Sequence, residues 1–128
     1  MLMGVGTDII EIKRITKACA NKRFIKRIYT LAEREYCLAR KNPYPCLAGR
    51  FAAKEAVLKA LGTGLAGCRF IDVEVLPSGA GKAPIVALYG GAKQAALAKG
   101  ISRVMVSVSH DQTKAIAFAV AVAGGEAE

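Results

Sequence analysis

Tryptophan is absent from this chain of 128 residues, and only one histidine is present. A single histidine is too few for a typical zinc site. The cysteines are dispersed, and none forms the C-x-x-C pair that is typical of zinc and redox motifs. They are Cys19, Cys37, Cys46 and Cys68. We therefore expect free thiols in a cytoplasmic protein.

Long hydrophobic runs are also missing, although 53% of the residues are hydrophobic. No stretch of about 18 uncharged apolar residues is present, so we expect no membrane span. The first residues lack the basic segment followed by an apolar segment that marks a signal peptide. The chain has the length of one domain and shows no repeat or low-complexity linker. We expect a single domain over residues 1–123 and a disordered tail over residues 124–128.

Acidic residues are scarce, with 10 Asp and Glu against 19 Lys and Arg and a net charge of +9. A field of this sign accelerates association with anionic partners without identifying them. A nucleic acid is the usual first candidate for a basic cluster. Aromatic residues within the cluster are few, Phe24 and Tyr29 among them, which gives little support for base stacking. A solvated helical face is a further alternative. The cluster comprises Lys13, Arg14, Lys17, Lys22, Arg23, Lys26, Arg27, Arg34, Arg40 and Lys41.

The segment 50–64 predicts a helix with an abrupt end. Its interior contains Ala, Leu, Lys and Glu, which are all good helix formers. Gly62 and Gly64 end it, because glycine takes the left-handed conformation of a helix C-cap without steric strain. At about 100° per residue, one narrow apolar stripe contains Leu47, Phe51, Leu58 and Leu61.

Charged residues of this helix lie along the boundary between core and solvent. Lys54 falls inside the apolar stripe and Arg50 near its edge, while Lys59 follows Glu55 by four residues. One interpretation is an amphipathic surface helix with snorkelling Lys and Arg stems and a weak Glu55–Lys59 pair. The other is an anion site with one carboxylate available to a metal.

An acidic residue also lies among strand-type residues near the N-terminus. Val5, Ile9 and Ile10 predict a strand over residues 3–10 that contains Asp8. An ionised carboxylate beside a core is unfavourable unless it is paired or binds a metal. Asp8 is therefore a hydrogen-bonded turn or cap residue, or it is a metal ligand together with Glu55. Mg²⁺ uses one or two protein carboxylates and completes its shell with water and phosphate oxygens.

The remaining patterns place helices in the first half and strands in the second. Thr30 and Glu33 match a capping box, which predicts a short helix that starts there. Alternation predicts strands over 70–76, 84–89, 104–108 and 115–120, and a helix over 92–99 ends at Gly100. Helices followed by antiparallel strands predict the α+β class.

Three segments together resemble the holo-[acyl-carrier-protein] synthases of fatty acid synthesis, which belong to the 4′-phosphopantetheinyl transferase superfamily. These segments are Gly4-Val5-Gly6-Thr7-Asp8-Ile9, Arg50-Phe51-Ala52-Ala53-Lys54-Glu55-Ala56 and Gly62-Thr63-Gly64. Shorter matches follow in the family's order, namely Thr30 with Glu33, Gly81-Lys82, and Ser107-Val108-Ser109-His110. The resemblance implies the fold of this superfamily, with a helical N-terminal half packed on an antiparallel sheet.

The resemblance implies transfer of the 4′-phosphopantetheine group from coenzyme A to a serine of an apo acyl carrier protein, which leaves adenosine 3′,5′-bisphosphate. Such a phosphoryl transfer needs a metal to neutralise charge and cations to hold the leaving group. The resemblance assigns Asp8 and Glu55 to Mg²⁺ and, with Lys59, to catalysis. Either Glu55 or a metal-bound water would take the serine proton. Lys54 would contact a phosphate or only snorkel.

Seven residues are carried over to the coenzyme A site, namely Arg50, Lys59, Gly62, Thr63, Gly64, Lys82 and His110. At Lys82 the turn reads Gly-Lys-Ala-Pro, so Ala83 is inserted relative to the Gly-Lys-Pro of the family.

The resemblance also implies partners. An acidic acyl carrier protein would dock against Arg14, Lys22, Arg23, Lys26 and Arg27. Family members form trimers with sites between subunits, and the apolar strands over 104–108 and 115–120 would suit such an interface. We expect neither a nucleic acid nor a membrane as partner, and a basic nucleic-acid-binding module is the alternative function.

Overall fold

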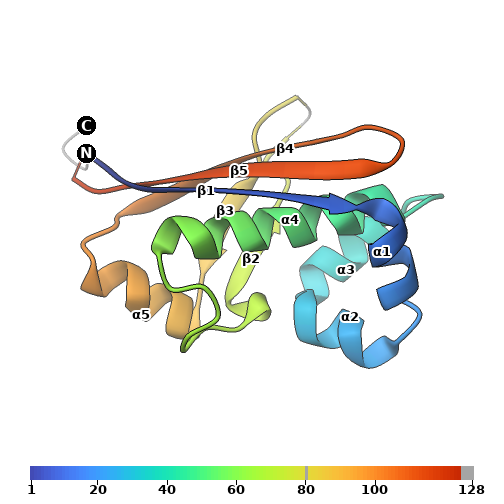
Figure 1. Ribbon diagram of the computed structural model, residues 1–128, viewed down its shortest axis with the longest axis horizontal. Coiled ribbons are helices and arrows are strands. Elements are labelled where there is room, and N and C mark those ends of the chain that lie inside the picture. The colour runs from blue at the N-terminus through green and yellow to red at the C-terminus, as the bar shows by residue number, and fades with distance from the viewer. Residues whose placement is uncertain (80, 125–128) are drawn as a thin grey trace.

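A three-stranded antiparallel sheet with one long helix across its face forms the centre of the computed structural model, which describes residues 1–79 and 81–124 (Figure 1). The strand order is β1-β5-β4, with β1 at Leu2–Glu11, β4 at Arg103–His110 and β5 at Lys114–Val122. The helix is α4, Tyr44–Leu61, and it packs across all three strands. A second sheet pairs β2, Val73–Leu76, with β3, Ile85–Leu88.

The shorter helices lie at the two ends of α4 (Figure 1). Three of them gather at one end, namely α1 at Ile12–Ala18, α2 at Lys22–Ile28 and α3 at Leu31–Leu38. Helix α5, Gly90–Ala98, lies at the other end, and the 3-10 helix η1, Phe70–Asp72, precedes β2. The predicted α+β class, with a helical N-terminal half packed on an antiparallel sheet, is confirmed.

Small residues allow α4 to lie very close to the sheet. The helix-facing side of β5 consists of buried alanines, namely Ala115, Ala117, Ala119 and Ala121. On β1, a Cβ atom at Gly4 would lie 2.0 Å from the Ala60 carbonyl oxygen, and one at Gly6 would lie 2.0 Å from that of Ala56. Only glycine therefore fits at either position, and the backbone of β1 runs directly against that of α4.

Two local predictions are confirmed. Helix α4 ends at Gly62, which has a φ of 81° in the left-handed region. Thr30 and Glu33 form the expected capping box at the start of α3, because the Thr30 hydroxyl accepts from the Glu33 N–H while the Glu33 carboxylate accepts from the Thr30 N–H.

Other boundaries differ from the sequence patterns. The strand expected from residue 70 begins only at Val73, because residues 70–72 form a 3-10 turn in which Asp72 accepts from the Arg69 N–H. The helix expected over 92–99 begins at Gly90. The prediction of a narrow apolar stripe on α4 is wrong, because most residues of this helix are buried. The sheet covers one side of the helix, and α1, α3 and β2 contact its other sides.

The described part of the chain contains no helix with the length and hydropathy that crossing a bilayer requires. Most of the tail expected over 124–128 lies outside the described residues, since only Gly124 is included.

Candidate active site

The first cluster of predicted site residues lies where β1 meets α4. Asp8 sits within β1, opposite Ala117 of β5, so it is not a turn or cap residue. The Lys59 ammonium donates to the Thr7 carbonyl at 2.9 Å and lies 3.6 Å from the Asp8 carboxylate. The ion pair that Lys59 makes among the described residues is therefore with Asp8, and the expected surface pair with Glu55 is not formed.

The two carboxylates of this cluster repel each other. Burial is the main cause that raises the pKa of Asp8, and Lys59 opposes it. Burial also raises the pKa of Glu55, the negative charge of Asp8 raises it further, and Lys59 again lowers it. Two half-buried carboxylates thus lie near one ammonium group, which pairs with Asp8. A divalent cation between them would relieve both the desolvation and the repulsion.

The segment Gly62-Thr63-Gly64 continues from the last turn of α4, with φ angles of 81° at Gly62 and 56° at Gly64. Sequence reasoning missed a cation at this helix end. The Lys99 ammonium, from the C-cap of α5, donates to the Leu61 carbonyl and so offsets the negative end of the α4 dipole. No local pattern marks Lys99, because its partner lies 38 residues earlier in the chain.

A second cluster lines a cavity of about 570 Å³. Three of the residues assigned to the coenzyme A site meet there, namely Arg50, Lys82 and His110. The sequence patterns missed Tyr36, Arg40 and Asn42, which line the same cavity from α3 and the loop after it. Spacing could not indicate them, because the turn between α3 and α4 brings them to the site.

Arg50 is the most distinctive residue of this cavity. Its guanidinium lies 5.1 Å from the centre of the Tyr36 ring, and only 9% of the residue is exposed. Within residues 1–79 and 81–124, no hydrogen-bond acceptor reaches its Nε atom. Burial lowers the pKa of Arg50, although nearby Tyr36 and Glu33 oppose this effect. A buried guanidinium donor without an acceptor on the wall of a cavity fits an anionic ligand.

Helix α4 and the sheet separate the two clusters. Arg50 and Lys59 are nine residues apart, which places them about half a turn from each other around the helix axis. Asp8 and His110 lie on opposite edge strands of the sheet, with β5 between them. A single chain therefore does not gather all of the predicted site residues in one place.

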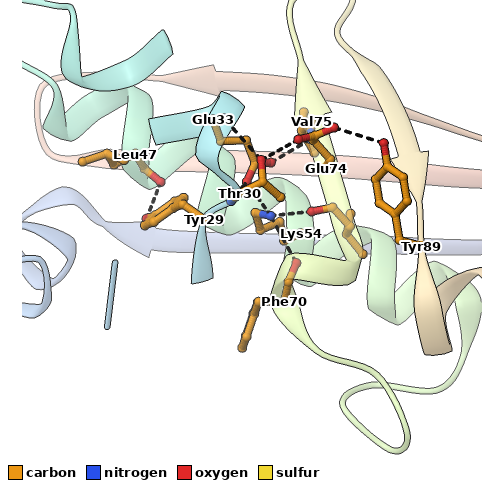
Figure 2. Close-up of polar contacts among 10 residues, drawn as sticks. Tyr29, Thr30, Glu33, Leu47, Lys54, Phe70, Glu74, Val75 and Tyr89 are labelled. Atoms are coloured by element: carbon orange, nitrogen blue, oxygen red, sulfur yellow. Dashed lines mark hydrogen bonds and ion pairs between the residues drawn. The ribbon is translucent and has the colours of Figure 1, made fainter. Parts of the chain in front are cut away.

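Both roles considered for Lys54 are wrong. Its side chain is fully buried, and its ammonium lies 2.7 Å from the Glu33 carboxylate. Figure 2 shows Lys54 among its polar partners. The ammonium also donates to the Phe70 carbonyl at 3.1 Å and to the Val73 carbonyl. Glu33 accepts in addition from the Val75 N–H at 2.7 Å. Lys54 thus joins α4 to α3 and to the start of β2, away from solvent and from any phosphate.

The predicted docking cations are available to a partner. All five are exposed, with Arg14 on α1 and the other four on α2, namely Lys22, Arg23, Lys26 and Arg27. Asn21 caps α2 by accepting from the Arg23 N–H at 2.8 Å. The two short helices are consecutive in the chain, so they carry these charges on one end of the molecule (Figure 1).

The expectation of free thiols is wrong for two of the four cysteines. Cys37 and Cys46 form a disulfide, with Cα atoms 5.5 Å apart, whereas Cys19 and Cys68 are free and buried. A separation of nine residues matches no cysteine motif. The turn between α3 and α4 brings the two sulfur atoms together.

Comparisons with known proteins agree on one family. A family model described as the 4′-phosphopantetheinyl transferase superfamily matches residues 4–120. A holo-[acyl-carrier-protein] synthase of Desulforudis audaxviator is 47% identical over 130 residues, which cover 100% of this chain and 98% of that protein. The structure of a holo-(acyl-carrier-protein) synthase from Bacillus anthracis in complex with CoA (3′,5′-ADP) is 36% identical and superposes with a TM-score of 0.80, covering 97% of this chain and 99% of that one. The corresponding Helicobacter pylori enzyme in complex with coenzyme A is 31% identical, with a TM-score of 0.75 and coverages of 92% and 99%.

Proposed function

The chain belongs to the 4′-phosphopantetheinyl transferase superfamily, and we propose that it transfers the 4′-phosphopantetheine group from coenzyme A to a serine of an apo acyl carrier protein in cytoplasmic fatty acid synthesis. The second product is adenosine 3′,5′-bisphosphate. The observation that carries the proposal is the cluster of Asp8, Glu55 and Lys59, in which the Lys59 ammonium pairs with Asp8 and a second desolvated carboxylate, that of Glu55, lies close enough to feel both charges. A nucleic-acid-binding module is not supported, because it would make no use of this cluster and the relatives described above are synthases.

The donor set of this cluster fits Mg²⁺. The carboxylate oxygens of Asp8 and Glu55 are the hard ligands that this ion prefers, and the repulsion between them falls when a cation binds. No group of three or more His, Cys, Asp or Glu side chains suited to a metal occurs in residues 1–79 and 81–124. The remaining ligands would therefore be water and phosphate oxygens. When bound, Mg²⁺ neutralises the charge on the pyrophosphate during phosphoryl transfer.

Lys59 and the glycine segment hold the phosphates. The Lys59 side chain is more than half exposed, so its ammonium can turn from Asp8 to a phosphate oxygen. Its hydrogen bond to the Thr7 carbonyl keeps it at this end of the site. Gly62 and Gly64 carry no side chain, so the backbone can approach the coenzyme closely. Thr63 lies between them and is partly buried.

The second cluster holds the 3′-phosphate end of coenzyme A. Arg50 offers an Nε–H that no acceptor of the described residues reaches, and Lys82 and His110 add a cation and a ring donor to the lining of the cavity. The inserted Ala83 does not remove Lys82 from the lining of this cavity. The Ser78 hydroxyl donates to the Ala83 carbonyl at 2.6 Å.

A second subunit completes the site. Because α4 lies between the clusters, Asp8, Glu55 and Lys59 of one chain would meet Arg50, Lys82 and His110 of another. The outer face of the sheet offers the surface for this contact, since it exposes large apolar side chains, namely Leu2, Met3, Val5, Ile9, Met105, Ile116 and Phe118. A patch of this kind marks an interface. We expect a homotrimer, in which each sheet packs on its neighbours.

The carrier protein docks on α1 and α2. The exposed cations Arg14, Lys22, Arg23, Lys26 and Arg27 match the acidic surface expected of an acyl carrier protein. Steering by these charges would raise the association rate, and this enhancement would fall as ionic strength rises.

The test is the mass of an apo acyl carrier protein after incubation with the protein, coenzyme A and Mg²⁺. We expect a phosphopantetheine adduct with the wild type and almost none with Asp8→Asn or Glu55→Gln. Glu11→Gln, an exposed carboxylate at the end of β1, is the matched control and should keep full activity. Full activity in both site variants would overturn the assignment, and absence of the adduct with the wild type would overturn the function.

A further inference from the structure

The disulfide between Cys37 and Cys46 borders the cavity assigned to the 3′-phosphate. Cys37 lies in the last turn of α3 and is fully buried, whereas Cys46 lies in the first turn of α4, is partly exposed and lines the cavity. The two sulfur atoms therefore differ in access. A small molecule that enters the cavity can reach Cys46, and Cys37 can be reached only through Cys46.

The bond closes a loop that itself forms part of the cavity wall. Between the two cysteines, Arg40 and Asn42 line the cavity. Tyr36 immediately precedes Cys37, and the guanidinium groups of Arg40 and Arg50 both lie over its ring. Apart from the disulfide, few backbone hydrogen bonds hold this exposed loop among the described residues. One of them joins the Arg40 N–H to the Cys37 carbonyl. With the bond, the positions of α3 and α4 are fixed on both sides of the loop.

We propose that Cys37 and Cys46 form a reversible thiol–disulfide site that reacts with small disulfides through the cavity, and whose oxidation orders Arg40 and Asn42 around an anionic ligand. In the cytoplasm, the compartment that the proposed function implies, disulfides are usually transient and redox-sensing rather than structural. The role of the ligand rests on the proposed function, whereas the reaction of the two cysteines does not.

The reaction balances as two thiol–disulfide exchanges. The Cys46 thiolate attacks a small disulfide RSSR, which forms a mixed disulfide on Cys46 and releases RS⁻. The Cys37 thiolate then attacks the Cys46 sulfur, which forms the protein disulfide and releases a second RS⁻. Two protein thiols are oxidised, RSSR is reduced to two RSH, and the two thiol protons pass to the released thiolates. The cations at the cavity, Arg40 and Arg50 among them, favour the thiolate that starts the sequence.

Oxidation should strengthen nucleotide binding by ordering the wall in advance. Closing a loop of this length removes conformational freedom that a ligand would otherwise have to restrict. The affinity for adenosine 3′,5′-bisphosphate should therefore be about threefold or more higher in the oxidised protein. Buried Cys19 and Cys68 lie outside the cavity lining and should not respond.

The experiment equilibrates the full protein with glutathione and glutathione disulfide at several ratios, followed by alkylation and peptide mass spectrometry. We expect Cys37 and Cys46 to become protected together while Cys19 and Cys68 stay free in the unfolded, alkylated protein. Calorimetry with adenosine 3′,5′-bisphosphate then compares both redox states of the wild type, of Cys46→Ser and of the control Cys68→Ser. The affinity difference should vanish only in Cys46→Ser.

Two results would overturn the inference. One is that Cys37 and Cys46 remain alkylated at every glutathione ratio. The other is that the affinity for the bisphosphate is equal in both redox states. If neither redox state binds the bisphosphate, the proposed function of the cavity fails, and so does the predicted effect of oxidation on ligand binding. The thiol–disulfide reaction is tested separately, because protection of Cys37 and Cys46 is measured without any nucleotide.

Discussion

Substitution of Lys54 by methionine tests how strongly the buried ion pair holds α4 in place. The Lys54 ammonium contacts the Glu33 carboxylate and donates to two backbone carbonyls, of Phe70 and Val73, with no solvent access. Methionine has a similar volume but leaves the Glu33 charge and both carbonyls without this donor. Breaking a buried pair in this way costs about 3–5 kcal/mol of unfolding free energy. That is a large part of the total stability of a domain, which is about 5–15 kcal/mol.

The assay is urea unfolding of Lys54→Met, Glu33→Gln and the double variant, with Lys26→Met as an exposed control that should change stability by at most about 0.5 kcal/mol. Glu33→Gln still offers an acceptor to the Val75 N–H and should be milder than Lys54→Met. The double variant buries no charge from this pair, so it should lose about 2 kcal/mol less than the sum of the two single losses. A loss below about 1 kcal/mol in Lys54→Met, or strict additivity of the two losses, would show that this ion pair does not hold α4 in place.

Three further predictions concern other parts of the molecule. Gly6→Ala should lower the unfolding free energy in urea by about 3 kcal/mol, the upper end of overpacking, because the new Cβ meets the Ala56 carbonyl, and an unchanged midpoint would contradict the close contact. Hydrogen bonds from the Lys114 and Thr113 N–H groups lower the pKa of Asp111, so its stabilising effect is present above its unfolded pKa and is lost as pH falls through the lower folded value. Thermal melts from about pH 5 to pH 3 should therefore fall more steeply for the wild type than for Asp111→Asn, and parallel curves would argue against the effect. Arg14→Glu with Arg23→Glu should raise KM for the carrier protein about tenfold or more and leave KM for coenzyme A unchanged, whereas equal increases would exclude this surface as the docking site.

The meeting of Asp8, Glu55 and Lys59 could be predicted from the sequence because the signals for it are local. Asp8 lies in a strand of β-branched residues, and Glu55 and Lys59 are one turn apart on a helix whose end is marked by glycine. The glycines of β1 are part of the same pattern, and the structure explains them by the close approach of α4. Residues within one element therefore determine which side chains face each other across the β1–α4 contact.

The remainder depends on contacts between distant segments. Helical spacing put Lys54 within the apolar side of α4. The burial of its ammonium, however, depends on Glu33 of α3 and on carbonyls of η1 and the start of β2, which no periodicity of α4 contains. The Cys37–Cys46 bond and the cavity wall depend on the turn between α3 and α4. The separation of Asp8 from His110 likewise follows from the strand order, in which the last strand lies between the first and the fourth.

In the proposed assembly, each site combines Asp8, Glu55 and Lys59 of one subunit with Arg50, Lys82 and His110 of another. The most direct measurement mixes two inactive variants, Asp8→Asn and the double variant Lys82→Ala/His110→Ala, both at exposed or half-buried positions. After subunit exchange at a 1:1 ratio, a site is intact when each subunit supplies its unaltered half, which happens for about one quarter of the sites in a cyclic assembly. Transfer of phosphopantetheine to an apo acyl carrier protein should therefore recover to about a quarter of the wild-type rate. A mixture that exchanges subunits and still shows no more activity than its components would contradict the account.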